Sequence, residues 1–223
     1  MAGDDEAEFD GVFAVRRPAS DSWMCCYKSQ AKRLNTIRPP ALPRQDFWRF
    51  CQENPDWRLE RDSDGAIRIK LPASLESGNR NHKLSVFLGI WARRDGTGEC
   101  FDSSTGFELP NGAIRSPDAA WVSKERLSGM PKARRRAFPR LVPEFVAEIR
   151  SESDSLAGLE EKMIEYADNG VLPGWLIDPF EQRVHVYRAG RAPVIADKPK
   201  SVSGDPVLRG FRWPLRDIWH VGF

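Results

Sequence analysis

Residues 116–170 constrain the fold of this 223-residue chain most strongly, because two short strand patterns within them each carry an acidic residue. In the pattern at 144–150, side chains alternate between two faces, so Glu148 and Arg150 share one face. Asp118 follows a proline at the start of the other pattern, where the missing N–H does little harm. We therefore expect two carboxylates and a cation to meet on neighbouring strands.

A helix is predicted for residues 151–169, directly after the second strand pattern. Its apolar residues recur at three- and four-residue spacing and are Leu156, Leu159, Met163 and Tyr166. Lys162 falls in the same stripe and is predicted to point inward, which is costly unless an anion is near. The alternative is a lysine whose stem covers apolar surface while its amine reaches water.

The rest of the chain predicts one α/β domain over residues 41–223, with a central mixed sheet flanked by helices. Two further helices are expected, over residues 42–54 and about 79–94. Further strands are expected at residues 57–60, 66–71, 99–102, 105–109, 113–116, 174–178 and 183–188. Residues 190–223 are expected to form a polar connection and a final apolar patch. Residues 1–40 are expected to form an arm, disordered in part.

Charged residues make up 30% of the chain and nearly cancel, at net +2, so total charge argues neither for nor against nucleic acid. Their distribution is uneven, because residues 124–150 hold eight Lys or Arg and three acids. This stretch creates a positive field beside the predicted acids. The residues that we expect to contact nucleic-acid phosphates are Lys132, Arg134, Arg135, Arg136 and Arg140. A solvated basic loop is the alternative.

The cysteines match neither the spacing of a metal site nor a disulfide framework; they are Cys25, Cys26, Cys51 and Cys100. The first thirty residues lack the apolar core of a signal peptide, and no window approaches the length of a membrane span. We therefore expect reduced thiols, a cytoplasmic location and no membrane partner.

Two carboxylates beside basic residues are typical of metal-dependent phosphodiester hydrolysis. Mg²⁺ and Mn²⁺ take oxygen ligands, usually including one or two protein carboxylates, which Asp118 and Glu148 supply. A cation on the same face, Arg150 or Lys162, would orient water or offset charge in the transition state. Glu76 is either a further catalytic acid or an acid that merely lies near a helix. Structural roles are the alternatives for the pair: a turn acid at Asp118, and an ion pair of Glu148 with Arg150.

The chain resembles the PD-(D/E)xK nuclease superfamily through Asp118 in Ser-Pro-Asp and through the sequence Glu-Ile-Arg at 148–150. The surroundings resemble its Uma-type branch of putative restriction endonucleases. The matching segments are 47–51, 59–61, 64–65, 76–81, 101–107, 116–118, 148–151, 162–163, 166, 169–171 and 174–179. The resemblance covers roughly residues 42–188 and implies a restriction-endonuclease-like core.

The chain departs from the superfamily at Arg150, where a lysine is usual. An arginine stays protonated, so it stabilises charge but is a poor proton shuttle. In the Uma-type branch the lysine is taken to lie on the following helix, which implies Lys162. The resemblance implies a Mg²⁺- or Mn²⁺-dependent DNA endonuclease, a homodimer if it cuts both strands, with RNA substrates left open. The alternative is a degenerate nuclease fold acting as a nucleic-acid-binding or interaction module.

Overall fold

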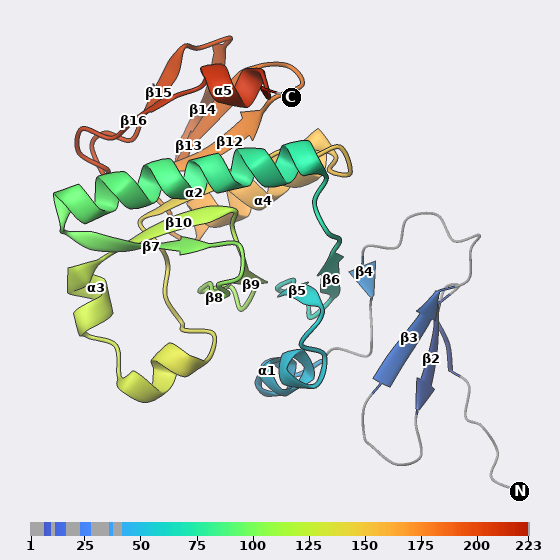
Figure 1. The fold of residues 1–223 in the computed structure, drawn as a ribbon. Coiled ribbons are helices and arrows are strands. Elements are labelled where there is room, and N and C mark those ends of the chain that lie inside the picture. Colours follow the sequence, from blue (N-terminus) through green and yellow to red (C-terminus); the bar gives the residue numbers. More distant parts are fainter. Residues whose placement is uncertain (1–6, 10–11, 17–22, 28–35, 38–41, 223) are drawn as a thin grey trace, which may run out of the picture.

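The computed structural model describes residues 7–9, 12–16, 23–27, 36–37 and 42–222 of the chain. Its core is a six-stranded sheet with helices on both faces (Figure 1). The helices are α1 (Arg44–Glu53), α2 (Leu75–Asp95), α3 (Lys124–Ser128), the 3-10 helix η1 (Lys132–Arg136), α4 (Leu156–Asp168) and α5 (Arg216–Trp219). None of the helices in the described residues is long and apolar enough to cross a membrane.

The central sheet has the strand order β14-β13-β12-β11-β10-β7. Its strands are β7 (Gly98–Asp102), β10 (Ala119–Ser123), β11 (Phe145–Ile149), β12 (Gly174–Asp178), β13 (Arg183–Arg188) and β14 (Arg191–Asp197). Strands β11 and β12 run parallel, and the other neighbours run antiparallel. Because parallel neighbours need a long crossover, α4 connects β11 to β12. The fold is mixed α/β, as the sequence predicts.

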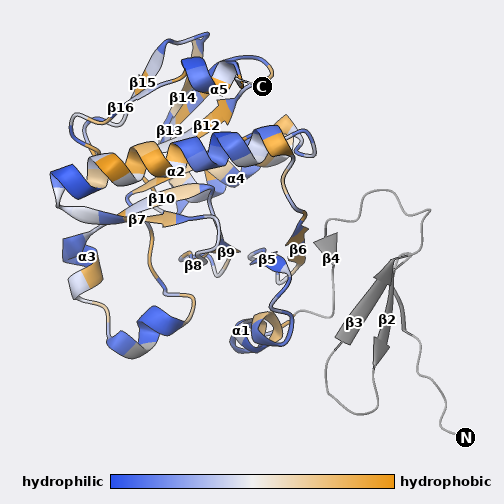
Figure 2. Ribbon diagram, viewed as in Figure 1, coloured by the Kyte–Doolittle hydropathy of each residue, from blue (hydrophilic) through white to orange (hydrophobic). Residues whose placement is uncertain are grey.

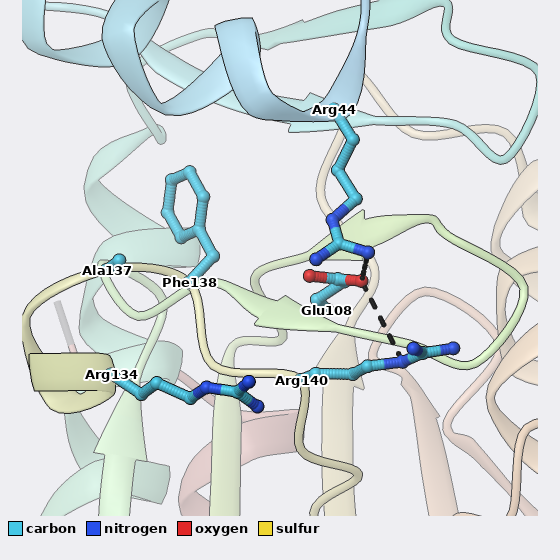
Figure 3. A pocket seen from close by; sticks show the side chains of 6 residues that line it. All are labelled: Arg44, Glu108, Arg134, Ala137, Phe138 and Arg140. Atoms are coloured by element: carbon cyan, nitrogen blue, oxygen red, sulfur yellow. Dashed lines mark ion pairs between the residues drawn. The ribbon is translucent and has the colours of Figure 1, made fainter. Parts of the chain in front are cut away.

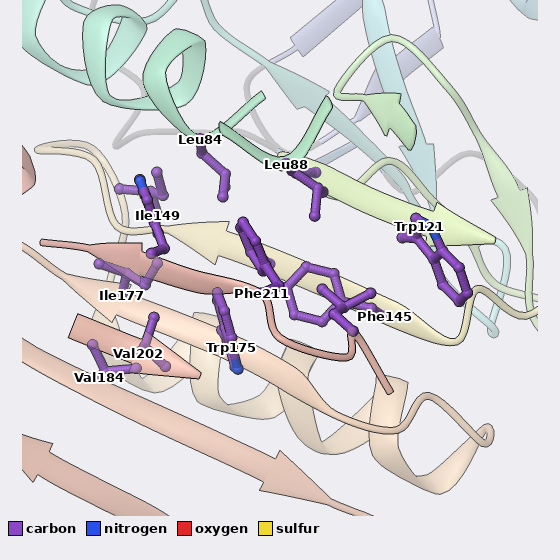
Figure 4. Close-up of a cluster of buried hydrophobic side chains, with 14 of the residues drawn as sticks. Leu84, Leu88, Trp121, Phe145, Ile149, Trp175, Ile177, Val184, Val202 and Phe211 are labelled. Atoms are coloured by element: carbon purple, nitrogen blue, oxygen red, sulfur yellow. The ribbon is translucent and has the colours of Figure 1, made fainter. Parts of the chain in front are cut away.

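Alternation along β11 divides its side chains between two apolar cores. Phe145 faces α2 and meets Trp175 edge to face, with ring centroids 4.8 Å apart (Figure 4). Val146 faces α4 and packs in the core that contains Met163. Glu148 continues the Val146 face, so the strand period directs its carboxylate toward α4.

A smaller sheet, of order β4-β6-β5-β9-β8, carries the expected hairpins. Its strands are β4 (Thr36–Ile37), β5 (Arg58–Arg61), β6 (Ile67–Lys70), β8 (Phe107–Glu108) and β9 (Ile114–Arg115). Gly65 turns the chain between β5 and β6 at φ 95°, a conformation that glycine adopts without strain. Helix α1 covers this sheet through Phe47, which packs with Leu59 and Ile114.

Two regions differ from the sequence prediction. Helix α2 begins earlier, after an N-cap at Ser74, so Glu76 lies in its first turn rather than ahead of it. Gly78 obscured this start, because glycine disfavours helix. The C-terminal region forms β14, α5 and the strand pair β15 (Ser201–Ser203) and β16 (Arg212–Pro214), not a connection with an apolar patch. The apolar residues of that patch close the α2-side core, where Trp213 is 1% exposed.

The predicted arm over residues 1–40 falls only partly within the described residues. Strands β1 (Ala7–Phe9), β2 (Val12–Arg16) and β3 (Trp23–Tyr27) form an antiparallel sheet, and β4 joins the smaller sheet of the domain. The remaining positions before residue 42 lie outside the described residues. The boundary between arm and domain therefore stays a prediction.

The close contact of β7 with β10 generates a test of the fold. A Cβ at Gly98 would overlap the indole of Trp121. We expect Gly98→Ala to lower the free energy of unfolding by about 1–3 kcal/mol, because the core must shift. Urea denaturation measures this change. The control is Gly89→Ala in α2, which has open space around it and should gain about 0.5–1 kcal/mol; a neutral result at Gly98 would contradict the packing.

Candidate active site

Asp118 and Glu148 lie on adjacent strands. In the antiparallel pair of β10 and β11, Ala119 is opposite Ala147, which brings the two acids to the next facing positions. Facing residues of antiparallel strands have Cβ atoms about 4.5–5.5 Å apart. The backbone N–H of Ile149 donates to Asp118 Oδ2 at 2.8 Å and holds this carboxylate against β11. The geometry thus brings together the two acids that the sequence pairs.

Helix α4 carries Lys162, which forms an ion pair with Glu148. Lys162 Nζ lies 2.7 Å from Glu148 Oε1, and Tyr166 donates its hydroxyl to the same oxygen at 3.1 Å. Glu148 is 3% exposed, and the Lys162 side chain is 11% exposed, so water screens this pair little. Residues four apart on a helix share a face, which explains why both side chains reach the same carboxylate. Lys162 therefore has the inward orientation that its place in the apolar stripe predicts.

A third acid, Glu60 of β5, belongs to the same cluster and has no role in the sequence prediction. It is 2% exposed, and its Oε1 lies 3.0 Å from Lys162 Nζ and 2.9 Å from Lys70 Nζ. The same oxygen accepts the backbone N–H of Ser116 at 2.9 Å. Lys162 thus bridges Glu60 and Glu148, which belong to different sheets. The sequence signals were an acid inside a hairpin strand and the family resemblance over residues 59–61, and neither indicated a lysine partner 102 positions later.

The charges of the cluster and its burial shift the pKa values of Glu60 and Asp118 in opposite directions. Burial alone would raise the pKa of Glu60, but Lys162 and Lys70, together with a nearby arginine, hold that pKa below its ordinary value. At Asp118, burial and then the charge of Glu148 raise the pKa to about 6, and the lysines offset only part of this. Asp118 is therefore the acid of the cluster whose ionisation costs most, and a bound cation would favour that ionisation.

The oxygen atoms around Asp118 suit a hard divalent cation. Asn81 of α2 donates Nδ2 to Asp118 Oδ1 at 3.2 Å, while its own Oδ1 is buried and has no hydrogen-bond partner among the described residues. Carboxylate and amide oxygens are ligands that Mg²⁺ and Ca²⁺ take in proteins. The part of the chain that the structure describes contains no group of three or more His, Cys, Asp or Glu arranged for a metal. A site here would use Asp118 and Glu148, with amide oxygens and water completing the shell.

Arg150 and Glu76, the other predicted catalytic residues, point to different partners. Arg150 Nη1 lies 2.8 Å from Asp178 Oδ2, not beside Glu148. Asp178 is fully buried and accepts two backbone N–H groups of the turn that follows it, which is the turn role expected from the sequence. Glu76 pairs with Arg80 at 2.8 Å, and its side chain is 49% exposed. The alternative pairing of Glu148 with Arg150 is therefore not what the structure shows.

The predicted phosphate-binding residues lie on the connection from β10 to β11. They are exposed, and they are Lys132, Arg134, Arg135, Arg136 and Arg140. The helical turn η1, which carries four of them, is hydrophilic in Figure 2. Asp118 precedes β10, whereas the connection begins after Ser123, so the five-residue strand, about 16 Å long, separates Asp118 from the start of the connection. The later part of the connection lies against β8, where Arg140 is near Glu108, and its contact with a substrate at the acids stays a prediction.

Arg134 and Arg140 line a hollow of about 260 Å³ together with Arg44 of α1 (Figure 3). Glu108 lies between Arg44 and Arg140, with its Oε1 2.8 Å from Arg44 Nη1 and 4.0 Å from Arg140 Nε. Three arginines and one acid leave this hollow positively charged. Arg44, to which the sequence prediction gives no role, extends the basic surface onto α1.

The raised pKa of Asp118 makes stability depend on pH. Between about pH 4 and 6 the folded chain holds this proton more tightly than the unfolded chain, so stability falls as the pH rises through that range. Asp118→Asn removes the charge, so without divalent metal at about pH 8 it should raise the free energy of unfolding by about 1–3 kcal/mol. The gain should vanish below about pH 4, as thermal unfolding across pH would show.

The control for this prediction is Asp46→Asn, which removes a partly exposed ion pair on α1. Such surface pairs contribute about 0–1 kcal/mol, so the variant should change stability little at any of these pH values. Equal or lower stability of Asp118→Asn at about pH 8 would contradict the unfavourable ionisation of Asp118.

Comparisons with known proteins identify the family and the fold of the chain. The model of the Uma2 family, described as putative restriction endonuclease, matches residues 44–216. A crystal structure from Anabaena variabilis ATCC 29413, described as a putative nuclease belonging to DUF820, matches with a TM-score of 0.61 and 17% sequence identity. That match covers 72% of this chain and 89% of the other, and it confirms the predicted fold. No curated protein matches the chain. Because the family model spans most of its length, the chain belongs to the Uma2 family of putative restriction endonucleases.

Proposed function

We propose that the chain is a metal-dependent endonuclease that hydrolyses phosphodiester bonds of DNA. The supporting observation is the facing pair Asp118 and Glu148, with Lys162 on Glu148, in a member of a putative restriction endonuclease family. The two carboxylates would hold Mg²⁺ or Mn²⁺, with the orphaned amide oxygen of Asn81 as a further oxygen donor. When bound, such an ion polarises the phosphoryl group and lowers the pKa of an attacking water.

Lys162 supplies the fixed positive charge of this site. Its Nζ is held between Glu148 and Glu60, so the ammonium needs no reorganisation when negative charge develops on the phosphate. Tyr166 restrains the shared oxygen of Glu148 from the same helix. Because Arg150 is engaged by Asp178, we assign charge stabilisation to Lys162 and give Arg150 a structural role.

The exposed arginines of η1, with Arg140 and Arg44, would contact DNA phosphates. Phosphate contacts add affinity without sequence preference and do not separate DNA from RNA, so the family description is the reason to favour DNA. Cutting both strands requires two sites, which we attribute to a homodimer. Cys51 and Cys100 are free thiols, in agreement with a cytoplasmic enzyme.

Plasmid nicking tests the proposed activity. The purified chain should convert supercoiled plasmid to open circles in Mg²⁺ or Mn²⁺ and not in chelator. Asp118→Ala and Glu148→Gln each remove a proposed metal ligand, so each should slow nicking about 100-fold or more. Calorimetric titration with Mn²⁺ should show binding to the unaltered chain and none to Asp118→Ala.

The rival function is a degenerate nuclease fold that binds nucleic acid without cutting it. The observation that favours it is the engagement of Arg150, which leaves the usual lysine position of the superfamily outside the site. If no DNA or RNA form is cleaved with either metal while binding persists, the enzyme proposal is wrong and the binding module replaces it.

The basic connection is tested separately by replacing its three consecutive arginines, Arg134, Arg135 and Arg136, with alanine. DNA binding should weaken on every sequence, and the plot of log affinity against log salt should flatten by nearly one unit for each phosphate that the variant no longer neutralises. Mn²⁺ affinity should stay unchanged, because the strand length separates these residues from Asp118. The control is the pair Arg93→Ala and Arg94→Ala at the end of α2; if the triple variant binds like this control, the connection is only solvated surface.

A further inference from the structure

A second hollow, of about 340 Å³, lies between α2 and the edge strand β7. Part of its lining is apolar and part is polar. The apolar residues are Leu88, Cys100, Phe101 and Ala119, and the polar residues are Ser85, Asp102 and Thr105. Its volume falls within the range of small-ligand sites, about 300–1,000 Å³.

This hollow lies on the α2 face of the sheet, because Leu88 and Ala119 belong to the α2-side core, whereas Glu148 points toward α4. Ala119 directly follows Asp118 and pairs with Asp102 across β10 and β7, so the hollow and Asp118 share one end of β10. Ser85 lies one turn after Asn81 on α2, about 6 Å further along the helix axis, and Asn81 donates to Asp118. A group in the hollow would therefore be a close neighbour of a phosphate at Asp118.

The lining excludes a phosphate as the occupant. It includes the Asp102 carboxylate and, among the described residues, no Lys, Arg or His. An anion there would meet the like charge of Asp102, and the cation that acts on this carboxylate, Arg58, lies outside the lining. A flat, uncharged group with an apolar face and polar edges fits this lining better, and in a nucleic acid that group is the base.

Asp102 determines which bases fit. Its Oδ1 accepts the backbone N–H of Ser104 at 3.0 Å and the hydroxyl of Ser104 at 2.5 Å, whereas its Oδ2 accepts no hydrogen bond within the described part of the chain. The Ser104 hydrogen bonds lower the pKa of Asp102, and an ionised carboxylate only accepts. The exocyclic amines of cytosine, adenine and guanine donate, while thymine has no exocyclic amine and presents O4, an acceptor.

We propose that this hollow is a nucleobase subsite, which takes an unpaired base with an exocyclic amine next to the phosphate that a cation on Asp118 and Glu148 would bind. The proposal rests on the proposed nuclease function and narrows its substrate class. A base that enters a pocket between a helix and a strand has to leave its duplex stack, which costs a few kcal/mol unless it is already unpaired. Single-stranded or locally unpaired DNA is therefore the preferred substrate.

Nucleosides test the subsite without any cleavage step. In NMR titrations of the metal-free full chain, deoxycytidine should shift the backbone amide signals of Ser85, Asp102 and Thr105, and thymidine should bind at least about fivefold more weakly. Asp102→Asn retains an acceptor for Ser104 but loses the charge, so its deoxycytidine affinity should fall about tenfold. Ser85→Leu fills the hollow while leaving Asp102 in place, and it should lose the same binding.

Asp46→Asn is the matched control and should bind deoxycytidine like the unaltered chain. Equal binding of both nucleosides, unchanged binding by Asp102→Asn and Ser85→Leu, or no binding at all would each overturn the subsite. Cleavage of single-stranded oligonucleotides in Mg²⁺ separates this outcome from the function itself. If cutting is seen but nucleoside binding is not, the nuclease stands without the subsite. If Asp102-dependent nucleoside binding is seen without cutting, the subsite belongs to a binding module.

Discussion

The position of Lys162 Nζ between Glu148 and Glu60 is the interaction on which the candidate site depends. Glu148 lies on the central sheet and Glu60 on the hairpin sheet, so one ammonium group joins the two sheets where they meet. Removing one partner of a buried ion pair leaves an uncompensated charge, which typically costs about 3–5 kcal/mol. The lysine therefore has a structural role that is separable from catalysis, and a loss of activity on its removal would not by itself prove a chemical step.

Positive charge is distributed unevenly within the cluster, and this determines at which acid a divalent cation is favoured most. Glu60 has two lysine partners and Glu148 has one, whereas the hydrogen bonds to Asp118 within the described residues come from two neutral donors, Asn81 and the N–H of Ile149. Negative charge is therefore least compensated at the Asp118 end, where Lys70 and Lys162 act on the carboxylate without a hydrogen bond to it. A divalent ion gains most there, because that is where the protein itself supplies the least positive charge.

Local patterns in the sequence were sufficient to predict that Asp118, Glu148 and Lys162 lie close together, because strand and helix periods fix which side chains share a face. They were not sufficient for Glu60, whose role depends on how a hairpin sheet packs against residues about a hundred positions away. Arg150 shows that the two-residue alternation of strand side chains applies only within the strand. Strand β11 ends at Ile149, and beyond a strand end the alternation no longer determines direction, so the side chain turns to Asp178. The C-terminal strands were missed for a related reason, since β14 is an edge strand with mostly exposed residues and little apolar alternation.

The connection of β10 to β11 shows why chain order alone misplaces a surface. Strands β10 and β11 are antiparallel, and the acids face each other where β10 begins and β11 ends. The chain that connects the two strands leaves from the opposite end of β10, after Ser123. A nucleic acid that contacts both the acids and the start of this connection has to run along the strand, over about 16 Å. At about 3.4 Å per nucleotide step, that length corresponds to about five steps. In the proposed nuclease, the scissile phosphate and phosphates bound by the arginines would thus be several nucleotides apart, which would leave the base beside Asp118 free to be held by contacts of its own.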